Sequence, residues 1–517
     1  MTSTKGLPGG WLSATLGAIR LDRSTSIDPS KLKTETFELY SIPAYPSGRP
    51  EVVTGNEVGS TKKSLAPGTV VVSKINPRIN RVWVVGERSA HRQIGSSEWI
   101  PFFPLEGLDP KYLAYFMQQD AFRNYLAANV SGVGGSLMRV KPSTLDPYPL
   151  VLAPGPEQSR IVEAIESYFT RLDDAVATLE RVQRNLQRYR ASVLKAAVEG
   201  RLVPTEAELA RAEGREYQPA SVLLERILAE RRLRWEEAEL ARMKTKAKVP
   251  KDDNWKAKYK EPVAPDSDTL PNLPEGWCWT RVDVAGHVQL GRQRSPAYHT
   301  GADMRPYLRV ANVFEDRIDT TDVMSMNFTA KDFAAYHLKY GDILLNEGQS
   351  PHLVGRPAMY KDEVPGACFT NSLIRFQASA GVDPRFALVV FLAQLHMRRY
   401  MRIAQITTNI AHLGAGRFAE VEFPLPPLLE QSRIADEVER LMTTTSVARA
   451  MVASNLARVA RLFQSILRWA FEGRLVDQDP TDEPASRLLE RILAERASAD
   501  GLPRQSSRRP RARSPKA

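Results

Sequence analysis

Residues 157–203 read EQSRIVEAIESYFTRLDDAVATLERVQRNLQRYRASVLKAAVEGRLV, and residues 430–476 read EQSRIADEVERLMTTTSVARAMVASNLARVARLFQSILRWAFEGRLV. The second stretch repeats the first 273 positions later. Apolar residues recur in both at steps of three and four, the spacing of helices that pair along one seam. The predicted seams are Ile161, Ile165, Tyr168, Leu172, Ala175, Leu179, Val182, Leu186, Tyr189, Val193 and Ala196, and Ile434, Val438, Leu441, Thr445, Ala448, Val452, Asn455, Val459, Leu462, Ile466 and Trp469.

Both predicted helices have start and stop signals. Prolines precede them (Pro154 and Pro156; Pro424, Pro426 and Pro427) and glycines follow them (Gly200; Gly473). About forty helical residues make a rod of roughly 60 Å. Two equal rods in one chain are expected to pack on each other. A coiled coil that only dimerises the protein or holds a bundle together is the alternative.

The rest of the composition excludes several classes of protein. A chain of 517 residues allows three or four domains. Its N-terminus shows no signal-peptide pattern, and its longest prominent apolar run, Phe386–Ala393, is too short to span a membrane. Cys278 and Cys368 are the only cysteines, so no disulfide scaffold or cysteine zinc site is expected. We therefore expect a cytoplasmic protein that does not bind membranes.

The net charge of +11 is concentrated in two segments. Residues 502–517 contribute +6 and residues 242–261 contribute +5, so the globular parts are only mildly basic. DNA binding would therefore depend on local patches. The basic end is interpreted as a disordered, solubilising tail.

The globular parts are repeated as well. LPGGW at Leu7–Trp11 returns as LPEGW at Leu273–Trp277, and each opens a mixed segment that ends at a rod. The segments from Pro110 and Pro384 align, each with a helix, a polar loop and a short run into the rod. Strands are predicted in the middle of both segments, at Thr69–Ser73, Arg81–Val85, Tyr307–Val313 and Asp342–Leu345. The chain is therefore a tandem duplication of domain and rod.

These motifs resemble the DNA-specificity subunits of type I restriction-modification systems. The resemblance rests on the paired EQSRI and EGRLV motifs, the LPxGW openings, and PASVLLERILAER at Pro219–Arg231 with DPTDEPASRLLERILAER at Asp479–Arg496. It covers nearly the whole chain. One departure is Gly68-Thr69-Val70-Val71, where the second domain has the family's Gly341-Asp342-Ile343-Leu344.

The resemblance implies an α+β fold in which two target-recognition domains are separated by two long antiparallel coiled-coil helices, with internal pseudo-twofold duplication. It implies binding to double-stranded DNA, to two methyltransferase subunits and to restriction (motor-nuclease) subunits. S-adenosylmethionine, ATP and Mg are expected on those partners and no cofactor or metal on this chain. The expected segments are recognition domain 1 (1–153), helical region 1 (154–240), a basic linker (241–272), recognition domain 2 (273–423), helical region 2 (424–498) and the tail (499–517).

Two pairs of loops are candidate DNA contacts, because Asn suits adenine and Arg suits guanine in the major groove. The first pair lies between strands and offers Lys74, Asn76, Arg78, Asn80 and Arg81 in one domain, and Asn346, Gln349, Ser350 and Arg356 in the other. The second pair precedes the rods and offers Ser131, Gly134, Ser136, Arg139 and Lys141, and Thr407, Thr408, Asn409, His412 and Arg417. Arg292, Arg294 and Arg309 are more generic candidates. A solvated basic hairpin and an ordinary turn remain the alternatives.

A repeated apolar stripe is a candidate partner surface. It consists of Leu223, Leu224, Ile227 and Leu228, and of Leu488, Leu489, Ile492 and Leu493. We expect these short helices to help dock the methyltransferase subunits; capping of the rods is the alternative.

Catalysis by this chain is not expected. The sequence contains no Gly-x4-Gly-Lys-Ser/Thr loop, no Gly-x-Gly-x-x-Gly turn, no His-Glu-x-x-His motif and no (Asp/Asn)-Pro-Pro-(Tyr/Phe) motif. A coiled-coil adaptor without a DNA role is the remaining alternative. An adaptor would have no evident use for two domains that are equivalent in position but divergent in sequence.

Overall fold

The computed structural model describes residues 6–21, 23, 25–130, 138–246, 250, 252–407 and 409–500. It divides into two compact units, of which unit 1 comprises residues 1–180 and 453–517 and unit 2 comprises residues 181–452. The two predicted rods are α4 (Gly155–Val198) and α12 (Leu428–Phe471), each 44 residues long. The units do not coincide with the segments expected from the sequence, because each rod contributes residues to both.

The described residues of unit 1 form sheets with the strand orders β2-β5-β8-β3-β4, β7-β6-β9 and β1-β10. Its strands are β1 (Leu12–Thr15), β2 (Ser26–Ile27), β3 (Thr36–Tyr40), β4 (Glu51–Thr54), β5 (Lys62–Ser64), β6 (Val70–Ser73), β7 (Val82–Val84), β8 (Arg92–Gly95), β9 (Trp99–Phe102) and β10 (Pro149–Leu152). Its helices besides the rods are α1 (Leu16–Ile19), α2 (Pro110–Met117), α3 (Asp120–Ala128) and α13 (Ala485–Asp500). The predicted strands at 69–73 and 81–85 are confirmed as the antiparallel pair β6 and β7.

Unit 2 contains sheets with the orders β12-β21-β17-β19, β16-β13-β20, β18-β23-β22, β14-β15 and β11-β24. Its strands are β11 (Cys278–Arg281), β12 (Gly286–Leu290), β13 (Met304–Leu308), β14 (Val313–Phe314), β15 (Arg317–Ile318), β16 (Met324–Asn327), β17 (Ile343–Asn346), β18 (Gly348–Gln349), β19 (Pro357–Met359), β20 (Cys368–Phe369), β21 (Leu373–Ala378), β22 (Gln405–Thr407), β23 (Ile410–His412) and β24 (Glu422–Leu425). Its helices are α5 (Glu206–Glu213), α6 (Ala220–Thr245), α7 (Val282–Ala285), α8 (Ala330–Tyr336), α9 (Pro384–His396), α10 (Arg399–Ile403) and α11 (Ala415–Ala419).

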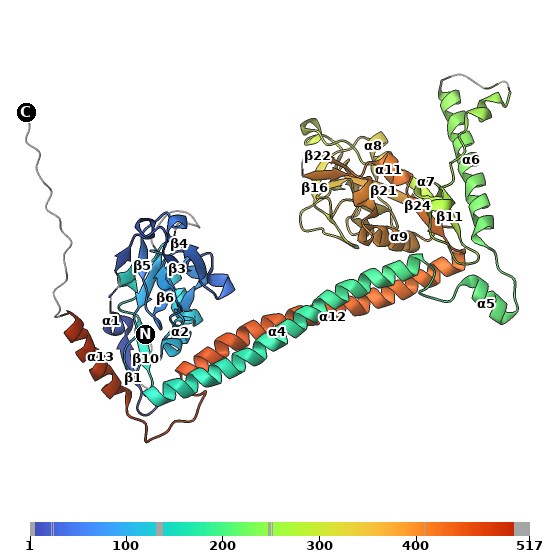
Figure 1. Ribbon diagram of the computed structural model, residues 1–517. Helices are drawn as coiled ribbons and strands as arrows, with labels where there is room; N and C mark the ends of the chain where they lie inside the picture. The colour runs from blue at the N-terminus through green and yellow to red at the C-terminus, as the bar shows by residue number, and fades with distance from the viewer. Residues whose placement is uncertain are drawn as a thin grey trace, which may run out of the picture. The chain divides into compact units, whose positions relative to one another are not determined.

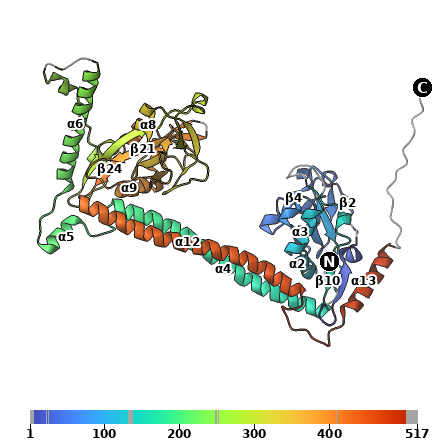
Figure 2. The same cartoon turned by 180° about the vertical axis from the view of Figure 1, so that it is seen from behind.

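The rods run antiparallel, and in each unit their segments lie side by side (Figures 1 and 2). In unit 1 the start of α4 packs with the end of α12, shown by the rings of Phe169 and Phe463 at 4.7 Å. In unit 2 the end of α4 shares a core with the start of α12, through residues such as Val193 and Ile434. The α+β fold with paired long helices is therefore confirmed.

Most predicted seam residues are buried or half-buried, at the rod ends and also in the middle of α12, where Thr445, Val452 and Val459 are buried. Ile161, Ile165, Val193, Ile434 and Val438 are buried. Several other predicted seam residues are instead largely exposed: Tyr168, Val182, Tyr189, Asn455 and Trp469. Only one neighbouring helix covers each rod there, so large side chains at the edge of the seam remain in contact with water.

A repeated hydrogen bond joins each domain to its rod. The indole nitrogen of Trp11 donates to a carboxylate oxygen of Glu157 at 2.9 Å, and Trp277 donates to Glu430 at 2.9 Å. Both carboxylates are buried, and burial raises the pKa of each. The LPxGW motif is therefore the partner of the first residue of the EQSRI motif.

The glutamine of EQSRI connects the rod to the helix before it. The Gln158 side chain accepts a bond from the Asp109 amide at 3.0 Å, and Gln431 accepts one from Asp383 at 2.8 Å. Asp109 and Asp383 in turn cap α2 and α9, each of which begins with proline. The repeated EQSRI motif therefore makes the same contacts in both units.

Candidate DNA interface

In unit 1 the loop after β6 meets the segment that precedes α4. The Asn76 amide donates to the Met138 carbonyl at 3.0 Å, and the Val140 amide donates to the Lys74 carbonyl at 2.9 Å. Ile75 and Arg139 form an antiparallel bridge between these bonds. Two predicted candidate loops are therefore neighbours.

Unit 2 repeats this pairing. β18 pairs with β23 so that Gly348 lies opposite His412, and the Leu413 amide donates to the Glu347 carbonyl at 2.8 Å. Each of these residues lies 273 positions after its counterpart in unit 1, the same offset that relates the two rods. The same offset therefore relates the central strand, the pre-rod loop and the rod of the two domains, whereas it is 274 in the helix between strand and loop, as for Asp109 and Asp383.

The turn into the central strand is also shared, despite the sequence departure. Gly68 and Gly341 both have positive φ, 75° and 89°. The Thr69 hydroxyl accepts the Ala66 amide at 3.3 Å, and the Asp342 carboxylate accepts the Lys339 amide at 3.0 Å. Thr and Asp are interchangeable here because each supplies a side-chain acceptor to an amide three residues earlier.

In unit 1 the candidate side chains divide into internal and outward-facing groups. Asn80 donates to the Met117 carbonyl at 3.0 Å, and Arg81 donates to the Ile75 carbonyl at 3.5 Å, so both brace the loop. Arg139 pairs with Glu98 at 3.3 Å. Arg78 is exposed on the short turn Pro77–Ile79. Lys141 is exposed, Lys74 and Asn76 are half-buried, and Ser131, Gly134 and Ser136 lie outside the described residues.

Two candidates in unit 2, Asn346 and Arg292, are buried and make internal contacts, so a DNA contact at them stays a prediction that their burial does not favour. Asn346 is fully buried at the end of β17 and donates to the Val313 carbonyl at 3.3 Å. Arg292 is buried against the Tyr298 ring at 4.0 Å and pairs with Asp332 at 3.0 Å. Their polar type suited DNA, but the fold uses both to satisfy internal groups.

Three further arginines in unit 2 make internal contacts. Arg356 donates to the Val313 carbonyl at 2.6 Å and stacks on Phe314, and burial lowers the pKa of its guanidinium. Arg309 pairs with Asp322. Arg417 donates to the carbonyls of Leu413 and His412, at 2.9 and 2.8 Å.

The remaining candidates in unit 2 gather around the hairpin of β22 and β23. Thr407 and Asn409 are exposed at its tip, and the His412 ring contacts Glu347 at 3.1 Å. Gln349 and Ser350 are half-buried on the adjoining segment, and Arg294 is exposed elsewhere in the unit. Thr408 lies outside the described residues.

Two apolar residues of this hairpin are not among the predicted contacts. Ile406 and Ile410 flank the polar tip, with 54% and 49% of their surface exposed. They were overlooked because candidates were selected by hydrogen-bonding capacity. The signal for them was apolar residues on both sides of a polar loop before a rod.

The apolar stripes on α6 and α13 pack mainly on their own domains. Leu223 and Ile227 are buried in the core of unit 2, and Leu488 and Ile492 in the core of unit 1. These four residues hold α6 and α13 onto the domains, and a partner contact at them stays a prediction. Leu224, Leu228 and Leu489 are half-buried, and Leu493 is exposed.

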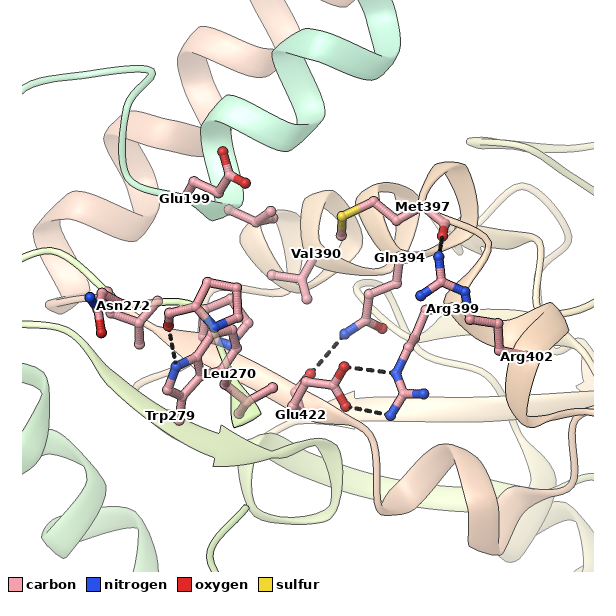
Figure 3. A pocket seen from close by; sticks show the side chains of 14 residues that line it. Glu199, Leu270, Asn272, Trp279, Val390, Gln394, Met397, Arg399, Arg402 and Glu422 are labelled. Atoms are coloured by element: carbon pink, nitrogen blue, oxygen red, sulfur yellow. Dashed lines mark hydrogen bonds and ion pairs between the residues drawn. The ribbon is translucent and has the colours of Figure 1, made fainter. Parts of the chain in front are cut away.

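Figure 3 shows the largest pocket described in unit 2, and none of the residues that line it belongs to these loops. It has a volume of about 470 Å³ and is lined by apolar groups that include Val198, Trp279 and Val390. Arg399 and Glu422 form an ion pair at 2.7 Å along its edge. In unit 1, Phe471 and Phe116 occupy the positions that correspond to Val198 and Val390, and their rings lie 5.2 Å apart. The pocket therefore exists where two aromatic rings are replaced by valines.

No helix in the described part of the chain is long and apolar enough to cross a membrane. Among the same residues, no three His, Cys, Asp or Glu side chains are grouped as a metal site requires.

Two mixed α/β domains, duplicated on a pair of long helices and each carrying paired loops, define a two-domain recognition protein. A family model described as "Type I restriction modification DNA specificity domain" matches residues 304–450. The EcoKI specificity subunit of Escherichia coli strain K12 is 23% identical over 400 residues, covering 75% of this chain and 72% of that protein. The StySPI specificity subunit of Salmonella potsdam is 23% identical over 410 residues, covering 77% and 74%.

A solved structure shows the same fold. It comes from work on complex assembly and conformational transition of the type I R-M system, and its chain matches at a TM-score of 0.60 and 19% identity. The match covers 90% of this chain and 99% of that chain. The chain is thus similar over most of its length to the specificity subunits of type I restriction-modification systems, and its residues 304–450 match the DNA specificity domain of that family.

Proposed function

We propose that this subunit recognises a bipartite DNA target, with one half-site read by the paired loops of each domain and with α4 and α12 as the spacer between them. The observation that supports this most directly is the common register of the two loop pairs, Ile75 with Arg139 and Gly348 with His412. The backbone pairing of the loops is the same in both domains, whereas the side chains at the paired positions differ.

The differences at matched positions favour two different half-sites. Lys74 corresponds to Glu347, and Asn76 corresponds to Gln349. Amide side chains pair with adenine edges, and basic side chains contact guanine or phosphate. A carboxylate accepts from cytosine. The same backbone frame would therefore select different bases in the two domains.

The partners follow from the class of complex. We propose that two methyltransferase subunits and the restriction subunits assemble on this chain, and that S-adenosylmethionine, ATP and Mg bind to those subunits. Leu224, Leu228, Leu489 and Leu493 remain candidate contacts, since they are less buried than the other residues of their stripes.

The test is methylation mapping with the assembled complex. Asn76→Ala and Arg78→Ala should each relax one half-site only, at a cost of ~1–3 kcal/mol if the residue contacts a base. Arg487, an exposed arginine on α13, provides a control substitution that should change neither half-site. An unchanged motif and unchanged affinity after replacing Lys74, Asn76 and Arg78 together would remove this loop from the interface.

Lys141 is proposed to contact phosphate. Lys141→Gln should weaken binding to all duplexes alike and reduce the slope of affinity against salt by about one. Titration of a specific and an unrelated duplex at several salt concentrations measures this. A loss confined to the specific duplex would contradict a phosphate contact.

A further inference from the structure

The hairpin of β22 and β23 presents an aliphatic side chain on each of its two faces. Ile406 lies opposite Ala411, and Thr407 lies opposite Ile410. Because successive strand residues point to opposite faces, Ile406 and Ile410 lie on different sides of the hairpin. Both are about half exposed, whereas Ala411 is fully buried.

These isoleucines do not serve the interior of unit 2. Neither belongs to the hydrophobic clusters that hold the described part of the unit together. Gln405, Thr407 and Asn409, which are all exposed, surround them. The hairpin therefore combines hydrogen-bonding groups with two exposed methyl-rich side chains.

The first domain has the same pattern in its sequence. At the offset of 273 positions, Val133 corresponds to Ile406 and Leu137 corresponds to Ile410. Three small or polar residues separate the aliphatic pair in both copies. Val133 and Leu137 lie outside the described residues. Between domains that have otherwise diverged, this repetition indicates a shared role for the aliphatic pair.

The hairpin also adjoins the other candidate loop rather than a distant surface. β23 pairs with β18, which follows the central strand β17 directly. Within unit 2, β22 and α6 lie on opposite sides of the domain in Figure 1. A protein docked along α6 would leave the hairpin free for DNA.

The chemistry of the major groove fits such a hairpin. The groove admits a two-stranded β-ribbon, and the C5-methyl group of thymine is the apolar feature that base pairs display there. We propose that β22 and β23 enter the major groove and that Ile406 and Ile410 contact thymine methyl groups, while the polar tip contacts base edges. This inference rests on the proposed function.

Uracil substitution tests the methyl contact. The probe is a set of duplexes that carry the target found by methylation mapping, each with one thymine of the second half-site replaced by uracil. This change removes a methyl group and leaves base pairing intact. The assembled complex should lose about three- to tenfold in affinity at one or two positions, as expected for one lost methyl contact.

The isoleucine variants complete the test. Ile406→Ala and Ile410→Ala should each lose affinity for the thymine duplex by a similar factor, and should lose nothing more when uracil replaces the thymine they contact. Val263 is 70% exposed and lies outside the hairpin, so Val263→Ala is a matched control that should retain the full uracil effect.

Several results would overturn the inference. These are tolerance of uracil at every position by the unsubstituted complex, a full uracil effect in both isoleucine variants, or a second half-site composed only of G·C pairs. Asn409→Ala separates this failure from failure of the proposed function. If Asn409→Ala relaxes the second half-site while the isoleucine variants keep the uracil effect, only the methyl contact is wrong. If neither change affects that half-site, the hairpin is not part of the interface.

Discussion

Val198 and Phe471 occupy the same position in the two copies of the rod, but only one carries an aromatic ring. In unit 1 the Phe471 ring contacts Tyr112 and Phe116, at 5.1 and 5.2 Å. In unit 2 the smaller Val198 lines a cavity of about 470 Å³. The pocket is partly open to solvent, and a larger apolar side chain at this position would gain contacts that Val198 does not make.

A reciprocal exchange tests this explanation of the cavity. Val198→Phe should fill part of the space and stabilise unit 2 by roughly 0.5–2 kcal/mol. Phe471→Val should open the corresponding space in unit 1 and destabilise it by about 1–3 kcal/mol. Thermal unfolding of both variants measures the two effects. Destabilisation by Val198→Phe would show that the cavity walls cannot accommodate the ring.

The buried carboxylate of Glu157 should make stability depend on pH. Burial raises its pKa above the ordinary value of 4.5, although the Trp11 indole and Arg160 act in the opposite direction and Asp482 adds to the rise. The folded state then holds a proton on Glu157 that the unfolded state has released. The free energy of unfolding should therefore fall as the pH rises from 4.5 through the raised pKa.

Substitution of this carboxylate should remove its contribution. Glu157→Gln keeps an oxygen that can accept the Trp11 bond and should flatten the decline in stability with pH. Glu430 has a raised pKa of the same origin, so part of the slope should remain until Glu430→Gln is added. Urea unfolding between pH 4 and pH 7 measures the slopes. An unchanged slope in the double variant would assign the decline to other groups.

The short helix α6 packs closely against a loop glycine. Gly381 has φ of 90°, and a Cβ added there would lie 2.6 Å from Leu223 Cδ1. Unit 1 repeats this contact between Gly107, with φ of 79°, and Leu488 on α13. Leu223 and Leu488 can pack this closely against the loops only because glycine has no Cβ atom.

Gly381→Ala should destabilise the docking of α6 by about 2–3 kcal/mol, from the strain of positive φ together with displacement of Leu223. Gly214 provides the matched control in the same unit, since its φ is 66° and a Cβ there would meet nothing within 4 Å. Gly214→Ala should cost only about 1–2 kcal/mol. Hydrogen exchange of α6 amides measures the difference. Equal protection in both variants would show that the contact with Leu223 contributes little.

The sequence was informative where spacing alone determines an element. The heptad pattern predicted both rods, and their proline and glycine boundaries agree with α4 and α12. The strand pairings were harder, because partners such as β3 and β8 pair in parallel across a long connection. The stripes of α6 and α13 correctly predicted helices, but an amphipathic pattern does not show what covers its apolar side.

Individual site residues were predictable only in part for a similar reason. Asn346 and Arg78 are both polar residues in candidate loops, yet one is fully buried and the other exposed. Residue type indicates which bonds a side chain can make. Burial, which decides whether DNA can reach it, depends on contacts between distant segments, such as the pairing of β17 with β21 and the bond from Asn346 to Val313 of β14.

The continuity of α4 and α12 leads to a prediction for the whole subunit. One heptad is ~10.5 Å of helix, which corresponds to roughly three base pairs of duplex at about 3.4 Å each. The contact of Phe169 with Phe463 places residues 172–178 approximately opposite residues 454–460. Deleting both heptads should keep the seam in phase while shortening the spacer.

We expect the shortened subunit to lose its original target. Three base pairs also rotate the duplex by roughly a third of its ten-base-pair repeat, so one half-site would no longer face its domain. Each domain should nevertheless retain its own half-site preference, because its loops and core are unchanged. Methylation mapping with the shortened subunit measures this, with co-purification of the partner subunits as the check on folding. If the shortened subunit assembles and still methylates the original sequence with its original spacing, the helices do not determine the distance between the half-sites.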